Sequence, residues 1–451
     1  MPMTPTQISL LKSYKKTLLF FDFLGLILIF LMAFSFRLGL SYQVALAQPL
    51  LAGIVLVNLG MLYIFGAYDI NDDLNTLDRF LRLLFANIFG FGLFVGFIYL
   101  TRTEISGILG RGIFLTSFLL FLAYAFILRL IFSLRLKYLR TSRWTWLAFG
   151  DLPILQRLTQ DARKNPALGQ LETILVEEQD DLNLVLNRIH EPWEGIIIAT
   201  KMPLPESTIN LLLNRRLGGL QIVSLTQAYE HFWGKLPVHF LDKQWLLTTE
   251  GFSITHNPVG LRVKRLMDIC LSILLLAITW PVLLLTIIAI QIDSKGPIFF
   301  RQIRTGKDGV DFSIIKFRSM TIDAEKNGAQ WATKNDVRVT TVGKWIRLTR
   351  IDELPQILNV LKGDMSFIGP RPERPEFNCE LEKQIPYYQL RHLLRPGITG
   401  WAQVKYPYGA SVEDAIEKLQ YELYYIKNYT VGLDLLIVLK TIKIVLFGKG
   451  R

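Results

Sequence analysis

Long runs of apolar residues dominate the first third of the chain. They lie at about 17–36, 45–66, 80–100 and 112–133. A helix of about 20 apolar residues crosses the roughly 30 Å hydrocarbon layer of a bilayer, because its backbone hydrogen bonds are all internal. We therefore predict a bundle of four transmembrane helices in residues 1–140. The first run has no small-residue cleavage site and is followed by three more, so it is interpreted as a retained span.

The charges beside these runs predict the orientation of the bundle. Basic residues stand just before the first run and just after the fourth: Lys12, Lys15, Lys16, Arg135, Lys137, Arg140 and Arg143. Loops rich in lysine and arginine stay on the cytoplasmic side of a membrane. With an even number of spans, both ends of the bundle are expected to face the cytoplasm.

A fifth apolar run, from Leu266 to Ile292, differs from the others because Pro281 lies in its middle. A proline there removes a helical hydrogen bond and kinks the axis. Basic residues flank the run on both sides, which favours the cytoplasmic side for both ends. A kinked helix that enters and leaves the same leaflet agrees with both observations. The alternative is a fifth crossing, which would place the rest of the chain outside the cell.

Residues 141–250 change to short apolar runs that alternate with amphipathic segments. The strand-like runs read WTWLAFG, LETILVE, EGIIIAT and LQIVSL. This alternation predicts a parallel, Rossmann-like α/β domain. The first strand ends at Gly150, but the following residues lack the other glycines of the dinucleotide-binding G-x-G-x-x-G pattern. We favour a regulatory or oligomer-forming role, the latter in a homo-oligomer, over nucleotide binding.

The composition narrows the classes of partner. Hydrophobic residues make up 51% of the 451 residues, and the formal net charge is +12. Such a charge suits nucleic acid, anionic lipid headgroups or a phosphorylated substrate. The apolar runs favour the membrane, and we expect no nucleic-acid partner. Only two cysteines occur, so neither a disulfide framework nor a cysteine-based metal site is supported, and the five histidines show no metal-ligand spacing.

Residues 260–451 contain the candidate chemistry, and its centre is the stretch RIDELPQILNVLKG. Apolar positions in this stretch fall on one face of a helix that Gly363 would end, which places Asp352 and Glu353 in its first turn. Taken alone, Asp352 is more simply explained as a helix cap, with Pro355 favoured beside it. Neighbouring cations favour phosphate binding instead, since arginine grips phosphate oxygens in bidentate fashion. These cations are Lys316, Arg318, Arg347, Arg350, Arg371 and Arg374.

A carboxylate pair among phosphate-binding cations suits phosphoryl transfer. Asp352 can act as a nucleophile and form an acyl phosphate. Mg²⁺ would bridge the carboxylate and the substrate phosphates, and it needs few protein ligands to do so. The prolines around Arg371 restrict the backbone and lower the entropy cost of gripping a ligand, although a plain turn between helices is the alternative. The basic residues also suit a surface that attracts anionic lipid, and we expect both uses.

Several motifs, in order along the chain, resemble those of one family. The motifs are KRLMDICLSILLLAITWPVLLL, IIKFRSM, RIDELPQILNVLKGDMSFIGPRPE, RPGITGWAQV and YYIKN. Together they resemble the bacterial sugar transferases of the monotopic polyprenyl-phosphate glycosyl-1-phosphate transferase superfamily, from Lys264 to the C-terminus. The four N-terminal runs and the α/β domain resemble its larger members, the undecaprenyl-phosphate glucose or galactose phosphotransferases. The resemblance implies a mainly helical catalytic domain with a re-entrant helix at about 266–292.

The resemblance also implies a reaction and a set of residues. A UDP-sugar would donate sugar 1-phosphate to a polyprenyl phosphate, as the first membrane step of exopolysaccharide, capsule or O-antigen synthesis at the cytoplasmic face of the inner membrane. Asp352 matches the nucleophile and Glu353 its partner in the dyad. The remaining matches are Lys316, Arg347 and Arg371 with basic positions of the site, and Pro281 with the kink of the re-entrant helix. The chain departs from some relatives at KYPYGAS, 405–411, which bears on sugar or nucleotide preference.

Two other functions stay open at this point. One is a membrane-anchored scaffold or regulator of polysaccharide export, against which the intact Asp352 and Glu353 argue. The other is metal-dependent hydrolysis of a diphosphate, with water as the acceptor. The tail YTVGLDLLIVLKTIKIVLFGKG is too charged to span a membrane comfortably, and it is interpreted either as an interfacial helix or as part of the core.

Overall fold

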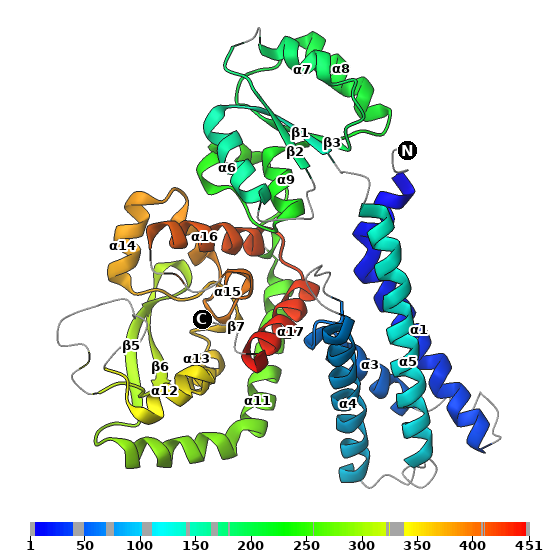
Figure 1. Cartoon of the computed structure of the whole chain (residues 1–451). Coiled ribbons are helices and arrows are strands. Elements are labelled where there is room, and N and C mark those ends of the chain that lie inside the picture. Colours follow the sequence, from blue (N-terminus) through cyan, green and yellow to red (C-terminus); the bar gives the residue numbers. More distant parts are fainter. Residues whose placement is uncertain are drawn as a thin grey trace. The chain divides into compact units, whose positions relative to one another are not determined.

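The computed structural model divides into two compact units, Met1–Arg143 and Trp144–Arg451 (Figure 1). It describes residues 5–38, 49–68, 76–101, 111–140, 145–163, 170–178, 181–255, 257–321, 324, 338–406, 409 and 411–447. Each unit is described by itself below.

The first unit consists of long apolar helices. They are α1 (Pro5–Leu38), α3 (Pro49–Ile64), α4 (Thr76–Thr101) and α5 (Arg111–Arg140). Two contain stretches long and apolar enough to cross a bilayer, Lys16–Phe36 and Gly112–Leu134, whereas Leu51–Ile64 and Phe80–Gly96 are shorter among the described residues. The predicted helices are confirmed, and the crossing of the membrane by all four stays a prediction.

An ion pair inside this bundle was not predicted from the sequence. The guanidinium of Arg129 in α5 donates two hydrogen bonds to Asp22 in α1, at 2.7 and 3.0 Å. The Asp22 side chain is fully buried. A charged residue among apolar helices requires a partner of opposite charge, because neither lipid nor protein interior solvates it. The pair therefore joins α1 to α5.

The second unit begins with a four-stranded parallel sheet in the order β2-β1-β3-β4. Its strands are β1 (Thr145–Gly150), β2 (Gln170–Leu175), β3 (Gly195–Ala199) and β4 (Gln221–Ser224), with helices α6 (Leu152–Arg163), α7 (Leu182–Arg188), α8 (Glu206–Leu217) and α9 (Leu225–Phe232). All four predicted strands are confirmed. Alternate residues of β1 belong to two different hydrophobic cores. Trp146 and Ala148 pack into one core, and Leu147 and Phe149 pack into the other. Helices therefore cover both faces, as expected for a parallel sheet.

The rest of the second unit carries the candidate site. Its helices are α10 (Lys243–Thr248), α11 (Pro258–Asp293), α12 (Thr341–Leu348), α13 (Ile357–Lys362), α14 (Pro375–Gln384), α15 (Trp401–Lys405), α16 (Val412–Lys427) and α17 (Val431–Phe447). Short 3-10 helices are η4 (Val238–Phe240), η5 (Ser253–Thr255), η6 (Lys307–Gly309), η7 (Ile351–Gln356) and η8 (Tyr388–Leu393). This part is mainly helical, as expected.

Two small sheets in this part were not predicted. β5 (Phe299–Thr305) and β6 (Asp311–Phe317) form an antiparallel hairpin, and β7 (Ser366–Ile368) pairs with β8 (Gly397–Thr399) in parallel. Asp308 and Gly309, in the hairpin loop, both have positive φ, 55° and 78°. An Asp-Gly pair is the sequence signal for such a turn, because glycine and aspartate tolerate the left-handed region.

Helix α11 is attached to this part at both of its ends. Near its start, Arg265 Nη2 donates to Leu361 O at 2.7 Å, at the end of α13. Just beyond its last residue, Arg318 Nη2 donates to Ser294 O at 2.6 Å. A straight helix of this length would separate its ends by about 54 Å, at about 1.5 Å per residue. Figure 1 shows that α11 instead turns partway along, and Pro281 is the proline inside it.

Helix α17 has one buried and one exposed face. Ile437 is fully buried, whereas Val431, Leu435 and Val445 are exposed. Lys264 of α11 donates at 2.9 Å to Asp434 of α17. The helix therefore packs against α11 through one face and presents apolar side chains on the other.

The α/β sheet is joined to the helical part through the segment that follows α9. Lys235 Nζ lies 3.0 Å from Asp161 Oδ2 of α6 and 2.6 Å from Glu417 Oε1 of α16. Leu236 N donates to Gln420 O at 3.0 Å. A buried lysine shared by two carboxylates fixes the contact between these elements, because each charge depends on the others for compensation.

Candidate active site

A cavity of about 710 Å³ lies among η7, α15, α16 and α17. Charged side chains line one part of it, among them Arg347, Arg350, Glu353, Arg371, Lys405 and Lys418. Apolar side chains line another part, among them Leu275, Leu354, Ile357, Ile442 and Val445. A mixed cavity of this size suits a ligand with an anionic end and a hydrocarbon part.

The backbone around the predicted carboxylate pair turns sharply. α12 ends at Leu348, and Arg350 then adopts a left-handed conformation with φ of 60°. Asp352 and Glu353 follow in the 3-10 helix η7, which leads directly into α13. Helix α13 ends at Gly363, whose φ is 102°. The predicted helix end at Gly363 is confirmed, but the first turn is 3-10 rather than α. This arrangement turns Asp352 and Glu353 inward, where they are 9% and 8% exposed.

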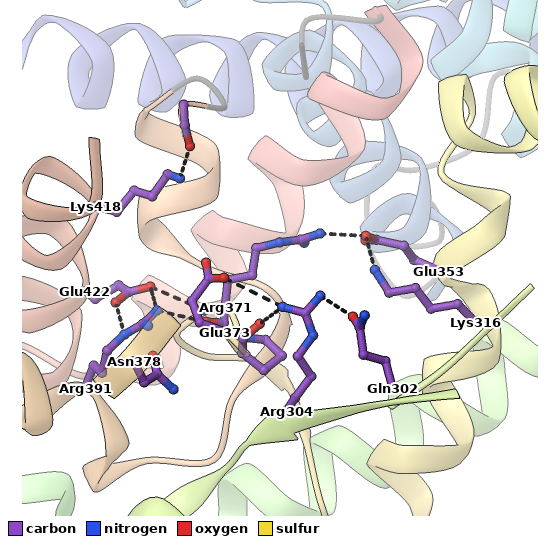
Figure 2. Close-up of polar contacts among 12 residues, drawn as sticks. Gln302, Arg304, Lys316, Glu353, Arg371, Glu373, Asn378, Arg391, Lys418 and Glu422 are labelled. Carbon is purple, nitrogen blue, oxygen red and sulfur yellow. Dashed lines mark hydrogen bonds and ion pairs between the residues drawn. The ribbon is translucent and has the colours of Figure 1, made fainter. Parts of the chain in front are cut away.

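Glu353 is held by cations from two other elements (Figure 2). Its Oε1 accepts hydrogen bonds from Arg371 Nη2 at 2.7 Å and from Lys316 Nζ of β6 at 3.2 Å. Burial raises the pKa of Glu353, but Arg371 and Lys316 outweigh this effect and hold the pKa well below its usual value. Glu353 is therefore ionised near neutral pH, and its charge is compensated.

The adjacent Asp352 differs from Glu353 in its hydrogen bonding and in the direction of its pKa shift. Its Oδ1 is buried and has no hydrogen-bond partner among the described residues. Burial, followed by the negative charge of Glu353, raises the pKa of Asp352 to about 6, against the opposing effects of Lys316, Arg350 and Arg347. Two adjacent carboxylates with separated pKa values divide roles in many active sites.

The structure brings several of the predicted polar side chains into one region: Glu353, Lys316, Arg347, Arg350 and Arg371. Arg347 and Arg371 line the cavity, and Arg347 Nη1 is a buried donor without a hydrogen-bond acceptor among the described residues. Lys316 contacts Glu353. Asp352 itself is not part of the cavity lining, but its neighbours Ile351 and Glu353 are.

Arg318 does not join this group. Its guanidinium donates to the carbonyl oxygens of Ser294 and Lys295, at 2.6 and 3.0 Å, and the residue is 6% exposed. The carbonyls at the end of a helix lack intrahelical donors, so a guanidinium satisfies them well. Arg318 therefore caps the end of α11, and it is not among the residues that line the cavity.

Sequence reasoning missed a second charged cluster beside Arg371. Arg391 of η8 and Glu422 of α16 form an ion pair at 2.9 Å, and both are almost fully buried. Arg304 of β5 forms an ion pair with Glu373 at 3.6 Å (Figure 2). These partners come from segments far apart in the sequence, so no local spacing indicates them.

The residues around Asp352 fit a divalent cation only as part of a shared site. Among the described residues, no group of three His, Cys, Asp or Glu could hold a metal ion. Asp352 Oδ1 offers one buried carboxylate oxygen that no protein donor uses. Mg²⁺ commonly takes one or two carboxylates and completes its shell with substrate phosphates and water.

Comparison with known proteins identifies the family. The family profile described as bacterial sugar transferase matches residues 259–448. The UDP-N-acetylgalactosamine-undecaprenyl-phosphate N-acetylgalactosaminephosphotransferase of Aeromonas hydrophila is 38% identical over 316 residues, which cover 69% of each chain. The chain belongs to the bacterial sugar transferase family. As a member of a transferase family the protein is an enzyme, so the family predicted from the motifs is confirmed and the scaffold alternative is excluded.

Other relatives match a smaller share of the chain. The UDP-glucose:undecaprenyl-phosphate glucose-1-phosphate transferase of Klebsiella pneumoniae is 44% identical over 188 residues, 41% of this chain and 40% of its own. A protein of the same name from Caulobacter vibrioides is 39% identical over 224 residues, 48% of this chain and 84% of its own. The family match begins at the start of α11 and includes η7, the Arg371 turn and α16.

Proposed function

We propose that the protein transfers a sugar 1-phosphate from a UDP-sugar to undecaprenyl phosphate. The names of the relatives from Aeromonas hydrophila and Klebsiella pneumoniae support both substrates, since each contains undecaprenyl phosphate and a UDP-sugar. The observation that carries the proposal is Oδ1 of Asp352, a buried oxygen without a hydrogen-bond partner among the described residues, beside a Glu353 whose charge is already compensated. The reaction would be the first membrane step in the synthesis of an exopolysaccharide, a capsule or an O-antigen.

The transfer takes place in two steps. In the first, Asp352 Oδ1 forms a bond to the phosphorus that carries the sugar, and the bond to the bridging oxygen of the diphosphate breaks. UMP leaves with that electron pair, and the phosphosugar stays on the aspartate as an acyl phosphate. In the second step an oxygen of undecaprenyl phosphate bonds to the same phosphorus, and Asp352 leaves as a carboxylate.

The neighbouring charged residues have distinct roles in the proposed reaction. Glu353 holds Lys316 and Arg371 beside the reacting carboxylate. Arg347 Nη1 is a buried donor with no acceptor among the described residues, and it would donate to a phosphate oxygen of the substrate. Fixed cations stabilise charge that develops on the transferring phosphoryl group, and they need no reorganisation during the reaction.

Asp352 also fits the proposed Mg²⁺ site. A bound Mg²⁺ would offset the negative charge of the diphosphate as it meets the carboxylate. Asp352 would supply the carboxylate that helps to hold this ion, and the donor phosphates and water would supply its other ligands. Removal of divalent cations with a chelator is therefore expected to stop UMP release, and added Mg²⁺ is expected to restore it.

The membrane arrangement follows from α11. Its apolar side chains are largely exposed in the protein, as suits contact with lipid: Leu274, Ile278, Trp280, Leu285 and Ile292. Both ends bind the same part of the chain, which supports re-entry into one leaflet over a crossing. With the four helices of the first unit as spans, the site lies at the cytoplasmic face of the inner membrane. Anionic lipid would attract the basic flanks.

One experiment tests the function. Membranes that contain the full chain receive Mg²⁺, undecaprenyl phosphate and UDP-sugars labelled in the sugar, each tested in turn. We expect label in the lipid fraction, with one UMP released for each labelled lipid. Asp352→Asn is expected to abolish both products. Asp364→Asn, which removes a carboxylate just beyond the other end of α13, is the matched control and is expected to retain them.

The other outcomes are distinct. Undiminished transfer by Asp352→Asn would refute the nucleophile assignment. Label that appears only as free sugar phosphate would favour hydrolysis, with water in place of the lipid acceptor.

A further inference from the structure

The ion pair between Arg391 and Glu422 is buried beside the candidate active site. Arg391 Nε donates to Glu422 Oε2 at 2.9 Å, and Arg391 Nη2 donates to Glu422 Oε1, also at 2.9 Å. The two residues are 5% and 3% exposed. A buried pair of this kind gives little net stability, because the cost of removing two charges from water offsets their attraction. A geometric role explains its presence better than a stabilising one.

The pair holds both backbone groups of Arg371. Arg391 Nη2 donates to Arg371 O at 2.8 Å, and Arg371 N donates to Glu422 Oε1 at 3.2 Å. The remaining donor, Arg391 Nη1, is bound to Tyr388 Oη at 2.6 Å, and Tyr388 Oη donates to Asn378 Oδ1 at 3.1 Å. The guanidinium of Arg391 is therefore fixed on three sides, and it fixes the peptide groups of Arg371 in turn (Figure 2).

Further contacts hold the turn on either side of Arg371. Arg304 Nη1 donates to Pro372 O at 3.2 Å, and Thr305 N donates to Glu373 O at 3.1 Å. Gly397 N donates to Pro370 O at 2.8 Å. Four successive carbonyl groups thus have donors from other segments, so little freedom remains in the backbone that carries the Arg371 side chain. Only that side chain reaches across to Glu353.

We propose that Arg391 and Glu422 are positioning residues that set the guanidinium of Arg371 against Glu353 and the substrate phosphate. This inference rests on the proposed function of the site. Neither residue needs to contact the reacting atoms, because each acts through the backbone of Arg371. A guanidinium displaced by about 1 Å loses much of its effect on a reacting phosphate, and such misplacement costs roughly a hundredfold in rate.

The first test is a double-mutant cycle in the full-length protein in membranes, with UMP release as the readout. Glu422→Gln keeps an oxygen acceptor but removes the charge that orients Arg391. We expect it to lower kcat roughly tenfold to a hundredfold in the wild-type background. In an Arg371→Ala background no guanidinium remains to be positioned, so the same change is expected to have no further effect on the residual rate.

A matched control comes from the same helix. Glu417→Gln also removes one carboxylate charge from α16, but Glu417 is half-buried and pairs with Lys235 and Arg157. We expect this variant to keep the wild-type kcat and KM.

A second variant separates positioning from folding. Arg391→Met combined with Glu422→Leu replaces the pair by apolar side chains of similar size, which is often neutral or favourable for stability. We expect a thermal unfolding midpoint at or above the wild-type value, together with the same loss of kcat. Arg371→Ala is again expected to make the double change silent.

The measured rates either support or overturn the positioning role of Arg391 and Glu422. Equal rate losses in the wild-type and Arg371→Ala backgrounds would overturn the positioning role, as would wild-type turnover by Glu422→Gln or by the double variant. A wild-type chain that releases no UMP would refute the proposed function itself, and the positioning role with it. If the wild type is active but the rate losses of Glu422→Gln and Arg371→Ala are additive, the positioning role alone would be overturned.

Discussion

Arg371 Nη2 lies 2.7 Å from Glu353 Oε1, whereas Oδ1 of the adjacent Asp352 is buried and has no hydrogen-bond partner among the described residues. Without the cations on Glu353, two buried neighbouring carboxylates could not both ionise easily near neutral pH. The contact therefore separates the roles of two residues that are adjacent and chemically alike. Glu353 anchors cations, and Asp352 is the residue that we propose attacks the donor phosphate.

The first prediction concerns Arg371. Arg371→Ala removes a fixed donor aimed at the transferring phosphate and leaves Glu353 with less compensation, so kcat for UMP release is expected to fall by about 10²–10³-fold. Arg371→Lys keeps the positive charge but loses the planar guanidinium, so its kcat is expected to lie between those of the wild type and Arg371→Ala. Arg395→Ala removes an exposed arginine near β8 and serves as the control. Wild-type turnover by Arg371→Ala would contradict the assignment.

The second prediction concerns pH. In the proposed mechanism Asp352 attacks as the carboxylate, and burial together with the charge of Glu353 raises its pKa to about 6. The rate of UMP release is therefore expected to fall as the pH drops through about 6. In Glu353→Gln the neighbouring negative charge is gone, so the pKa of Asp352 falls and the acid limb is expected to move to lower pH, whatever the maximal rate. A limb that stays in place or moves to higher pH would contradict this.

The third prediction concerns stability at the contact between the α/β sheet and α16. Lys235→Met would remove the buried cation shared by Asp161 and Glu417, and would leave them only the more exposed Arg157 as a cationic partner. We expect the free energy of unfolding to fall by about 3–5 kcal/mol, measured by pulse proteolysis of the whole protein in detergent. The control Lys243→Met changes an exposed lysine of α10 and is expected to fall within about 0.5 kcal/mol of the wild type. Equal effects of the two changes would refute a structural role for Lys235.

The fourth prediction concerns the topology of α11. Val259 and Lys307, which flank the helix, are both exposed. Single cysteines at these positions, in a chain with Cys270→Ser and Cys379→Ser, are expected to react with an impermeant maleimide in inverted vesicles and not in intact cells. Re-entry places both flanks on one side. Labelling of position 307 only from outside intact cells would show that the helix crosses the membrane.

Elements with a strong local pattern could be predicted from the sequence. Continuous apolar runs indicated α1, α3, α4 and α5, and short apolar runs separated by amphipathic segments indicated β1 to β4. Gly363 ends α13 because its positive φ suits a residue without a side chain. The hairpin of β5 and β6 was not predicted although Asp308 and Gly309 carry the turn signal, because Phe299–Thr305 reads FFRQIRT, in which polar and apolar residues do not alternate regularly.

The pairing of charged residues could not be predicted in the same way. Six cations near Asp352 and Glu353 in the sequence looked equivalent, yet Arg371 and Lys316 contact Glu353 while Arg318 binds the end of α11. Likewise, 31 residues separate Arg391 from Glu422 along the chain. Such choices depend on tertiary structure, which a local pattern does not contain.

The central claim is a covalent phosphosugar on Asp352. The most direct measurement is the intact mass of the purified protein after incubation with UDP-sugar and Mg²⁺ but without undecaprenyl phosphate. We predict an added mass equal to one sugar phosphate, with one UMP released, located on Asp352 by peptide mapping and discharged by added undecaprenyl phosphate. Asp352→Asn is predicted to show no added mass. An adduct of the same mass on Asp352→Asn, or steady transfer to lipid without any adduct on the wild type, would contradict the account.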